Sequence, residues 1–167
     1  MYQKGNLETG CLFFALAFLI YNVYSSIMDA QNGITLYIQS GIIPFRRKDE
    51  HIEILLITNK KKDKWGIPKG LVEEGLSASE SAQKEAFEEA GIYGRIYKPS
   101  LGKYSIKKWE GKCRIKVFAM EVTQYLDKWP EDILRKREWY SVEEAAGMVK
   151  NKKLQAMILG LPQYLED

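Results

Sequence analysis

Cysteine and histidine are scarce in this chain of 167 residues. Two cysteines, Cys11 and Cys113, are too few for a disulfide framework, and a single histidine, His51, argues against a histidine-based metal site or catalytic triad. Carboxylates are the plentiful hard ligands that remain, and they favour magnesium, manganese or calcium over zinc. The scarcity of thiols leads us to expect a reducing, cytoplasmic compartment.

A strong excess of one charge is also missing. The 25 basic and 22 acidic residues leave a net charge of +3, so the total does not indicate a nucleic-acid-binding protein. No internal repeat or low-complexity linker divides the sequence. The length suits one domain with its own core.

One apolar run, "CLFFALAFLIYNVYSS", lies near the beginning of the sequence. Its uninterrupted part is short for a membrane span and close to the length of a signal-peptide core, but its flanks fit a signal peptide poorly. The alternatives are a helix packed on the domain or on a partner, or translation that starts at Met28. We expect residues 1–30 to form an N-terminal extension and residues 31–167 the domain, with membrane contact only through residues 11–24.

From residue 34 onward the sequence alternates between strand and helix patterns. Residues 34–45 and 51–58 are rich in β-branched side chains and predict strands, joined by the polar stretch "RRKDE". A hairpin over residues 104–122 that turns near Glu110, a short strand over 136–142 and closing helices over 141–150 and 153–165 complete the pattern. It predicts an α+β fold in which a mixed sheet lies between helical layers.

A helix is predicted over residues 78–90, with a clear start and end. Ser77 is a good N-cap residue, and Glu80 three positions later completes a capping box. Gly91 can adopt the left-handed conformation that ends a helix.

Three glutamates lie close together on this helix. Glu85, Glu88 and Glu89 are spaced i, i+3 and i+4, which places them on one face. Their charges repel, and the last helical turn prefers cations. A bound divalent cation would relieve both penalties, whereas the alternative is a solvated acidic face.

The stretch from Gly70 to Ile92 resembles the Nudix box, a long motif with fixed spacing. The residues that match it in place are Gly70, Glu85, Glu88, Glu89, Gly91 and Ile92. Two positions depart from the pattern: Leu76 replaces a glutamate, and Lys84, which can pair with Glu80 four residues earlier, replaces an arginine. The resemblance extends over about residues 34–165 and is strongest to the branch that hydrolyses diphosphoinositol polyphosphates and diadenosine polyphosphates.

This resemblance implies a Nudix-type α/β/α sandwich with a catalytic loop-helix-loop. It also implies hydrolysis of a phosphoanhydride bond, dependent on Mg²⁺ (or Mn²⁺), in a nucleoside diphosphate derivative or a diphosphoinositol-type polyanion. Glu88 and Glu89 would be metal ligands, and Glu85 either a further ligand or the base that accepts the proton of water. The backbone carbonyl of Lys69 would add another ligand.

Glu121 is a further candidate catalytic carboxylate. Strand alternation places it on the same face as Cys113 and Ala119, at the end of a small and apolar row. One interpretation is a base or supporting carboxylate that points into the cleft, as acids on this strand of the family can. The other is a strand-end glutamate that reaches solvent.

Basic residues are dense around the expected cleft: Arg46, Arg47, Lys60, Lys61, Lys62, Lys64 and Lys69. They favour a small polyphosphate substrate rather than a specific nucleic acid. We expect Arg46, Lys60, Lys64 and Lys69 to contact it, beside a close backbone approach at Gly70. Trp65 and Tyr104 can stack a base or serve in packing. A Nudix-fold binding module with little turnover is the alternative function, and the oligomeric state is left open.

Overall fold

The computed structural model describes residues 26–29, 34–108 and 110–166. Residues 11–24, through which any membrane contact is expected, lie outside these ranges. Within them, no helix is both long and apolar enough to span a bilayer.

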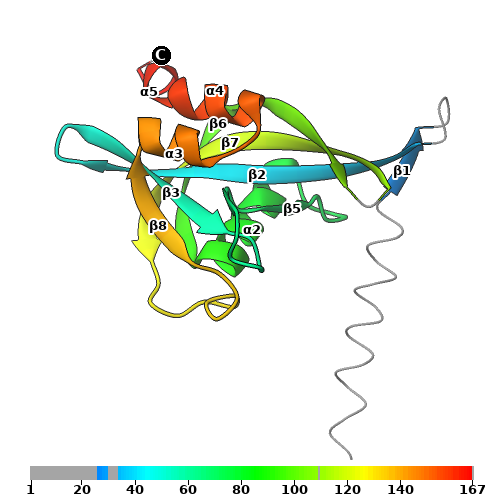
Figure 1. Ribbon diagram of the computed structural model, residues 1–167, viewed down its shortest axis with the longest axis horizontal. Coiled ribbons are helices and arrows are strands. Elements are labelled where there is room, and N and C mark those ends of the chain that lie inside the picture. Colours follow the sequence, from blue (N-terminus) through cyan, green and yellow to red (C-terminus); the bar gives the residue numbers. More distant parts are fainter. Residues whose placement is uncertain (1–25, 30–33, 109, 167) are drawn as a thin grey trace, which may run out of the picture.

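A mixed, eight-stranded sheet forms the centre of the domain (Figure 1). Its main order is β4-β3-β2-β7-β6, while β1 and β5 pair with β2, and β8 pairs with β3. Among the described strands, only the β2–β7 pair is parallel. The strands are β1 (Ser26–Asp29), β2 (Ile34–Lys48), β3 (His51–Thr58), β4 (Trp65–Gly66), β5 (Lys69–Leu71), β6 (Ile92–Lys108), β7 (Gly111–Tyr125) and β8 (Arg137–Ser141).

Helices cover both faces of this sheet, as the predicted α+β layers require (Figure 1). Helix α2 (Ala78–Ala90) packs through Ala82, Ala86 and Ala90 on one face. The opposite face carries α3 (Val142–Met148), α4 (Lys152–Leu159) and α5 (Leu161–Tyr164). The apolar row on β7 that begins at Cys113 is buried under this second group of helices, so the predicted alternation is confirmed.

The caps of α2 are also confirmed. The Ser77 side chain accepts from the Glu80 amide, and the Glu80 side chain accepts from the Ser77 amide. Gly91 has φ 63° and ψ 39°, the left-handed conformation that ends the helix. The local sequence therefore determines where the glutamate-bearing helix begins and ends.

Several boundaries differ from the prediction. The first strand of the predicted hairpin, β6, begins at Ile92 and not at residue 104. The expected connection over residues 46–50 is wrong, because β2 continues through Lys48 and pairs with β3 as far as His51, which leaves only a tight turn with Asp49 at φ 53°. The closing stretch 153–165 is two helices, since the chain is interrupted at Gly160 and restarts with Pro162 in the first turn of α5.

Candidate active site

Strand β5 brings a glycine against one of the α2 glutamates. Gly70 pairs with Ser40 of β2 and lies directly over the carboxylate of Glu85. A Cβ atom at Gly70 would lie 1.7 Å from Oε1 of Glu85, well inside van der Waals contact. Position 70 therefore needs a glycine, because any Cβ atom there would displace the Glu85 carboxylate.

Glu89 is held from two sides. The backbone amide of Lys69 donates to its Oε2 at 2.9 Å, and the Arg135 guanidinium forms an ion pair with its Oε1. The side chains of Glu89 and Arg135 are each only 10% exposed. The strand β5 backbone and a residue just before β8 thus fix this carboxylate.

The partly buried Glu85 and the buried Glu89 resist carrying charge together. Burial raises the pKa of Glu85 to about 8, and repulsion from Glu89 and Glu88 adds to the increase. Burial also raises the pKa of Glu89, although Arg135 and Lys69 oppose it. A nearby cation would favour the ionised form of both groups, which is the condition expected of metal-binding carboxylates.

The side chains present fit a hard divalent cation. In the described ranges, no three acidic, cysteine or histidine side chains already converge as a metal cluster. Glu88 is 40% exposed and lies 3.8 Å from the ammonium of Lys84. Magnesium commonly uses one or two carboxylates and takes its other ligands from water and substrate phosphates. One or two of the carboxylates of Glu85, Glu88 and Glu89 would therefore suffice as its protein side-chain ligands, and all three, like the Lys69 carbonyl, stay predicted ligands.

Lys84 makes different contacts from those predicted. Its ammonium bonds to Glu73 at 2.6 Å and lies near Glu88, whereas Glu80 is occupied in the N-cap. The expected Lys84–Glu80 pair is therefore wrong. The hydrogen bond that Lys84 donates to Glu73 raises the pKa of Lys84, so this side chain remains a cation tied to the loop before α2.

The last turn of α2 contains no basic residue, and the positive charge at this end of the helix comes from Arg137. Arg137 of β8 donates to the carbonyls of Ala90 and Leu126, and its guanidinium lies 3.9 Å from the centre of the Trp129 ring. The Trp129 indole donates to the Glu89 carbonyl at 3.2 Å. These contacts satisfy carbonyl groups that the helix leaves without intrahelical donors.

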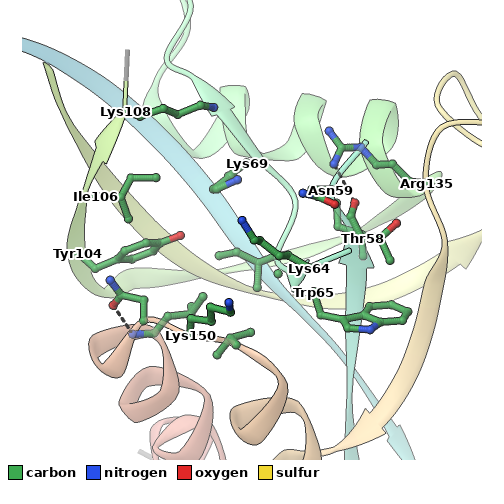
Figure 2. A pocket seen from close by; sticks show the side chains of 16 residues that line it. Thr58, Asn59, Lys64, Trp65, Lys69, Tyr104, Ile106, Lys108, Arg135 and Lys150 are labelled. Atoms are coloured by element: carbon green, nitrogen blue, oxygen red, sulfur yellow. Dashed lines mark hydrogen bonds between the residues drawn. The ribbon is translucent and has the colours of Figure 1, made fainter. Parts of the chain in front are cut away.

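A cavity of about 470 Å³ lies beside Lys69 and Arg135. Figure 2 shows Tyr104 and Ile106 on one wall and Trp65 on another, with lysine side chains between them. None of the described residues that line it is acidic. Its charged lining residues are Lys64, Lys69, Lys108, Arg135 and Lys150.

The predicted substrate contacts divide into two groups. Lys64 and Lys69 line the cavity, whereas Lys60 pairs with Glu131 at 2.8 Å. Arg46 pairs with Glu53 at 2.6 Å and stacks over Trp139, and it does not line the cavity. The structure therefore does not bring Arg46 to the site.

Glu121 also lies away from the α2 glutamates. It accepts hydrogen bonds from Tyr97 and Arg95, both at 2.8 Å, on the face of the sheet that carries α3 to α5. Its strand partner on β2 is Phe45, four positions beyond Gly41, which pairs with Lys69. The Tyr97 hydrogen bond lowers the pKa of Glu121 despite some burial, so it is a stable carboxylate in its own ion-pair network.

Sequence reasoning missed three of the cations near the site. Arg135 precedes β8, Lys108 ends β6, and Lys150 lies between α3 and α4. None of these three residues belongs to a periodic pattern or motif in the sequence that would have indicated a binding role. Only the fold brings these distant segments to the same cavity.

The fold and site define a protein of the Nudix class, and comparison with known proteins supports this directly. The NUDIX domain model matches residues 37–158, which is most of the sequence. The chain belongs to the Nudix hydrolase family.

Individual relatives agree with this assignment. Nudix hydrolase 21 of Arabidopsis thaliana is 38% identical over 117 residues, which cover 66% of this chain and 59% of the relative. Diphosphoinositol polyphosphate phosphohydrolase 3-beta of Bos taurus is 32% identical over 117 residues, covering 69% and 70% of the two chains. The Ap4A hydrolase of C. elegans has a similar fold, with a TM-score of 0.65, 18% identity, and coverage of 78% of this chain and 98% of the other.

Proposed function

We propose that this protein is a divalent-metal-dependent hydrolase of diphosphate bonds in a small, highly phosphorylated molecule. The proposal depends mainly on the partly buried Glu85 and the buried Glu89. Glu89 contacts Lys69 and Arg135, which line a cavity whose charged lining residues, among those that the structure describes, are all cationic. Phosphoryl transfer to water requires charge neutralisation and an aligned nucleophile more than covalent chemistry. The site supplies residues for both tasks.

Each residue has a specific role in this proposal. Glu88 and Glu89 hold Mg²⁺ or Mn²⁺, and Glu85 is a further ligand or accepts the proton of the attacking water. When bound, the metal neutralises phosphate charge and makes water more acidic. Lys64 and Lys69 bind phosphate oxygens from the cavity side, where they orient the diphosphate toward the glutamates.

The substrate class follows from the extent of the positive surface. A second hollow of about 780 Å³ adjoins the cavity and shares Tyr104, Lys150 and Asn151 with it. Its charged lining residues are Lys103, Lys112, Arg114, Lys150, Lys152 and Lys153. A substrate with several phosphates, such as a diphosphoinositol polyphosphate or a dinucleoside polyphosphate, matches this run of cations. The names of the Bos taurus and C. elegans relatives support the same class.

Phosphate release from a panel of substrates tests the proposal. The panel contains dinucleoside polyphosphates, diphosphoinositol phosphates, ADP-ribose and capped RNA, each with Mg²⁺ and with chelator. We expect release from at least one phosphate-rich member, and only with metal. Binding of the same molecules without hydrolysis of any would favour the alternative, a Nudix-fold binding module.

A further inference from the structure

Helix α2 carries the partly buried Glu85 and the buried Glu89, but it lacks the arginine that the Nudix box has next to them. Lys84 occupies that motif position, yet its ammonium is engaged with Glu73 and approaches the exposed Glu88. In the described part of the chain, no ion pair joins Lys84 to the more buried Glu85 or Glu89. The fixed position of the Glu89 carboxylate therefore has another source.

Arg135, in the loop before β8, contacts Glu89 from outside helix α2. Its three guanidinium nitrogens have three different acceptors: Nη2 donates to Glu89 Oε1, Nε to Glu131 Oε2, and Nη1 to the Thr58 carbonyl at 2.9 Å. The planar guanidinium can donate to all three acceptors at once in fixed directions. A lysine ammonium has a single nitrogen on a flexible stem, so it would orient these acceptors less strictly. The loop before β8, the end of β3 and helix α2 are thereby joined through one side chain.

We propose that Arg135 is a positioning residue that orients the Glu89 carboxylate for metal binding, a task that Lys84 at its motif position does not perform. This inference rests on the proposed metal-dependent function. A carboxylate has about four lone-pair sites, and the contacts from Arg135 and Lys69 use two of them. Two remain for a cation, while the carboxylate is prevented from rotating. Outer partners of this kind commonly determine metal affinity and activity.

The experiment compares Arg135→Gln and Arg135→Lys with Arg137→Gln as a matched control. Arg137 also comes from the β8 region and contacts α2, but it bonds to backbone carbonyls and not to a glutamate side chain. Mn²⁺ affinity is measured by calorimetry without substrate, and kcat and KM are measured with the best substrate. Circular dichroism and thermal unfolding report the folding of each variant.

We expect both Arg135 variants to weaken Mn²⁺ binding by about 10-fold or more and to reduce kcat, with KM changed much less. The Arg137→Gln variant should lose thermal stability but keep its Mn²⁺ affinity within about threefold. Because Mn²⁺ binding is read without turnover, the inference is tested even if no substrate on the panel is hydrolysed.

In Arg135 variants that fold, either of two results would overturn the proposal. Unchanged Mn²⁺ affinity in folded Arg135 variants would leave Arg135 a purely structural residue. A large increase in KM with kcat and Mn²⁺ affinity unchanged would make it a substrate-binding residue instead. If neither Arg135 variant folds, Glu131→Gln removes one of the anchors of Arg135 and should still weaken Mn²⁺ binding; no change there would equally contradict the proposal.

Discussion

Gly70 determines where the partly buried carboxylate of Glu85 can lie, although Gly70 has no side chain of its own. Replacement by alanine would put a methyl group 1.7 Å from Glu85 Oε1, so the carboxylate or strand β5 must move. We expect Gly70→Ala to destabilise the protein by about 1–3 kcal/mol and to lower kcat by about 100-fold, since small displacements of reacting groups are costly. Thermal unfolding and steady-state kinetics measure both effects.

Gly147→Ala is the matched control, because a Cβ atom there meets nothing within 4 Å. It lies in α3, where alanine favours the helix. Stability should be equal or slightly higher, and activity unchanged. A Gly70→Ala enzyme as active as the control would show that Glu85 does not need its present position.

The pKa of Glu85 predicts a specific pH dependence of stability without metal. Between about 4.5 and about 8, the folded protein keeps a proton on Glu85 that the unfolded chain releases. Stability should therefore fall as pH rises through this window, by at most about 1.4 kcal/mol per pH unit from this group. Denaturant unfolding in chelator, at pH 5 to 8, measures the slope.

The Glu85→Gln variant carries no titrating group at this position and should lack that part of the slope. Added Mg²⁺ should also reduce it in the unmodified protein, because a cation favours the ionised carboxylate. A slope that is identical in the variant and the unmodified protein would contradict this explanation.

At the scale of elements, the cavity is built by segments that are far apart in the sequence. The loop before β4 supplies Lys64, β6 supplies Tyr104 and Lys108, and the junction of α3 and α4 supplies Lys150 (Figure 2). Substrate recognition should therefore depend on these elements and not on the β2–β3 hairpin, where Arg46 is held by Glu53.

Replacing Lys64 by glutamine should raise KM about fivefold with little change in kcat, as expected for a loss of about 1 kcal/mol of phosphate binding. Arg46→Gln is the control and should leave KM unchanged, since Arg46 does not line the cavity. The same effect in both variants would mean that the substrate reaches the β2–β3 hairpin. Initial rates over a range of substrate concentrations distinguish these outcomes.

Elements with local signals were predictable from the sequence, and long-range contacts were not. The capping box at Ser77, the end of α2 at Gly91 and the alternation on β7 depend on neighbouring residues, and all three are confirmed. The ion pair between Arg135 and Glu89 joins residues 46 positions apart, and no periodic pattern encodes it. The extension of β2 through residues 46–48 was not predicted, because these residues are polar. Their backbone nevertheless pairs in register with β3.

At the scale of the whole molecule, the small net charge conceals a strong separation of charge. Acidic side chains gather on α2, whereas all the charged residues that line the cavity and the adjoining hollow, among those that the structure describes, are cations. The total of +3 could not predict this arrangement, because it depends on how the sheet brings the two regions together. The α2 carboxylates would hold a metal ion at this boundary, and its positive charge would offset the like charges of these carboxylates and of the substrate phosphates.

Residues 11–24 lie outside the described ranges, and their role stays a prediction. We propose a cytoplasmic location in which these residues do not anchor the protein. After cell lysis and fractionation, the full chain and a chain that begins at Met28 should both remain in the soluble fraction. Membrane association of the full chain alone would show that the apolar run is an anchor.

We propose above all that the α2 glutamates bind the metal that hydrolysis requires. Mg²⁺-dependent phosphate release should fall by at least about 100-fold in Glu89→Gln, because several kcal/mol of charge stabilisation are lost. The matched variant Glu121→Gln removes a carboxylate from the separate network of Arg95 and Tyr97 and should keep most of the activity. Release that survives Glu89→Gln, or that is lost in Glu121→Gln while the protein remains folded, would contradict this role of the α2 glutamates.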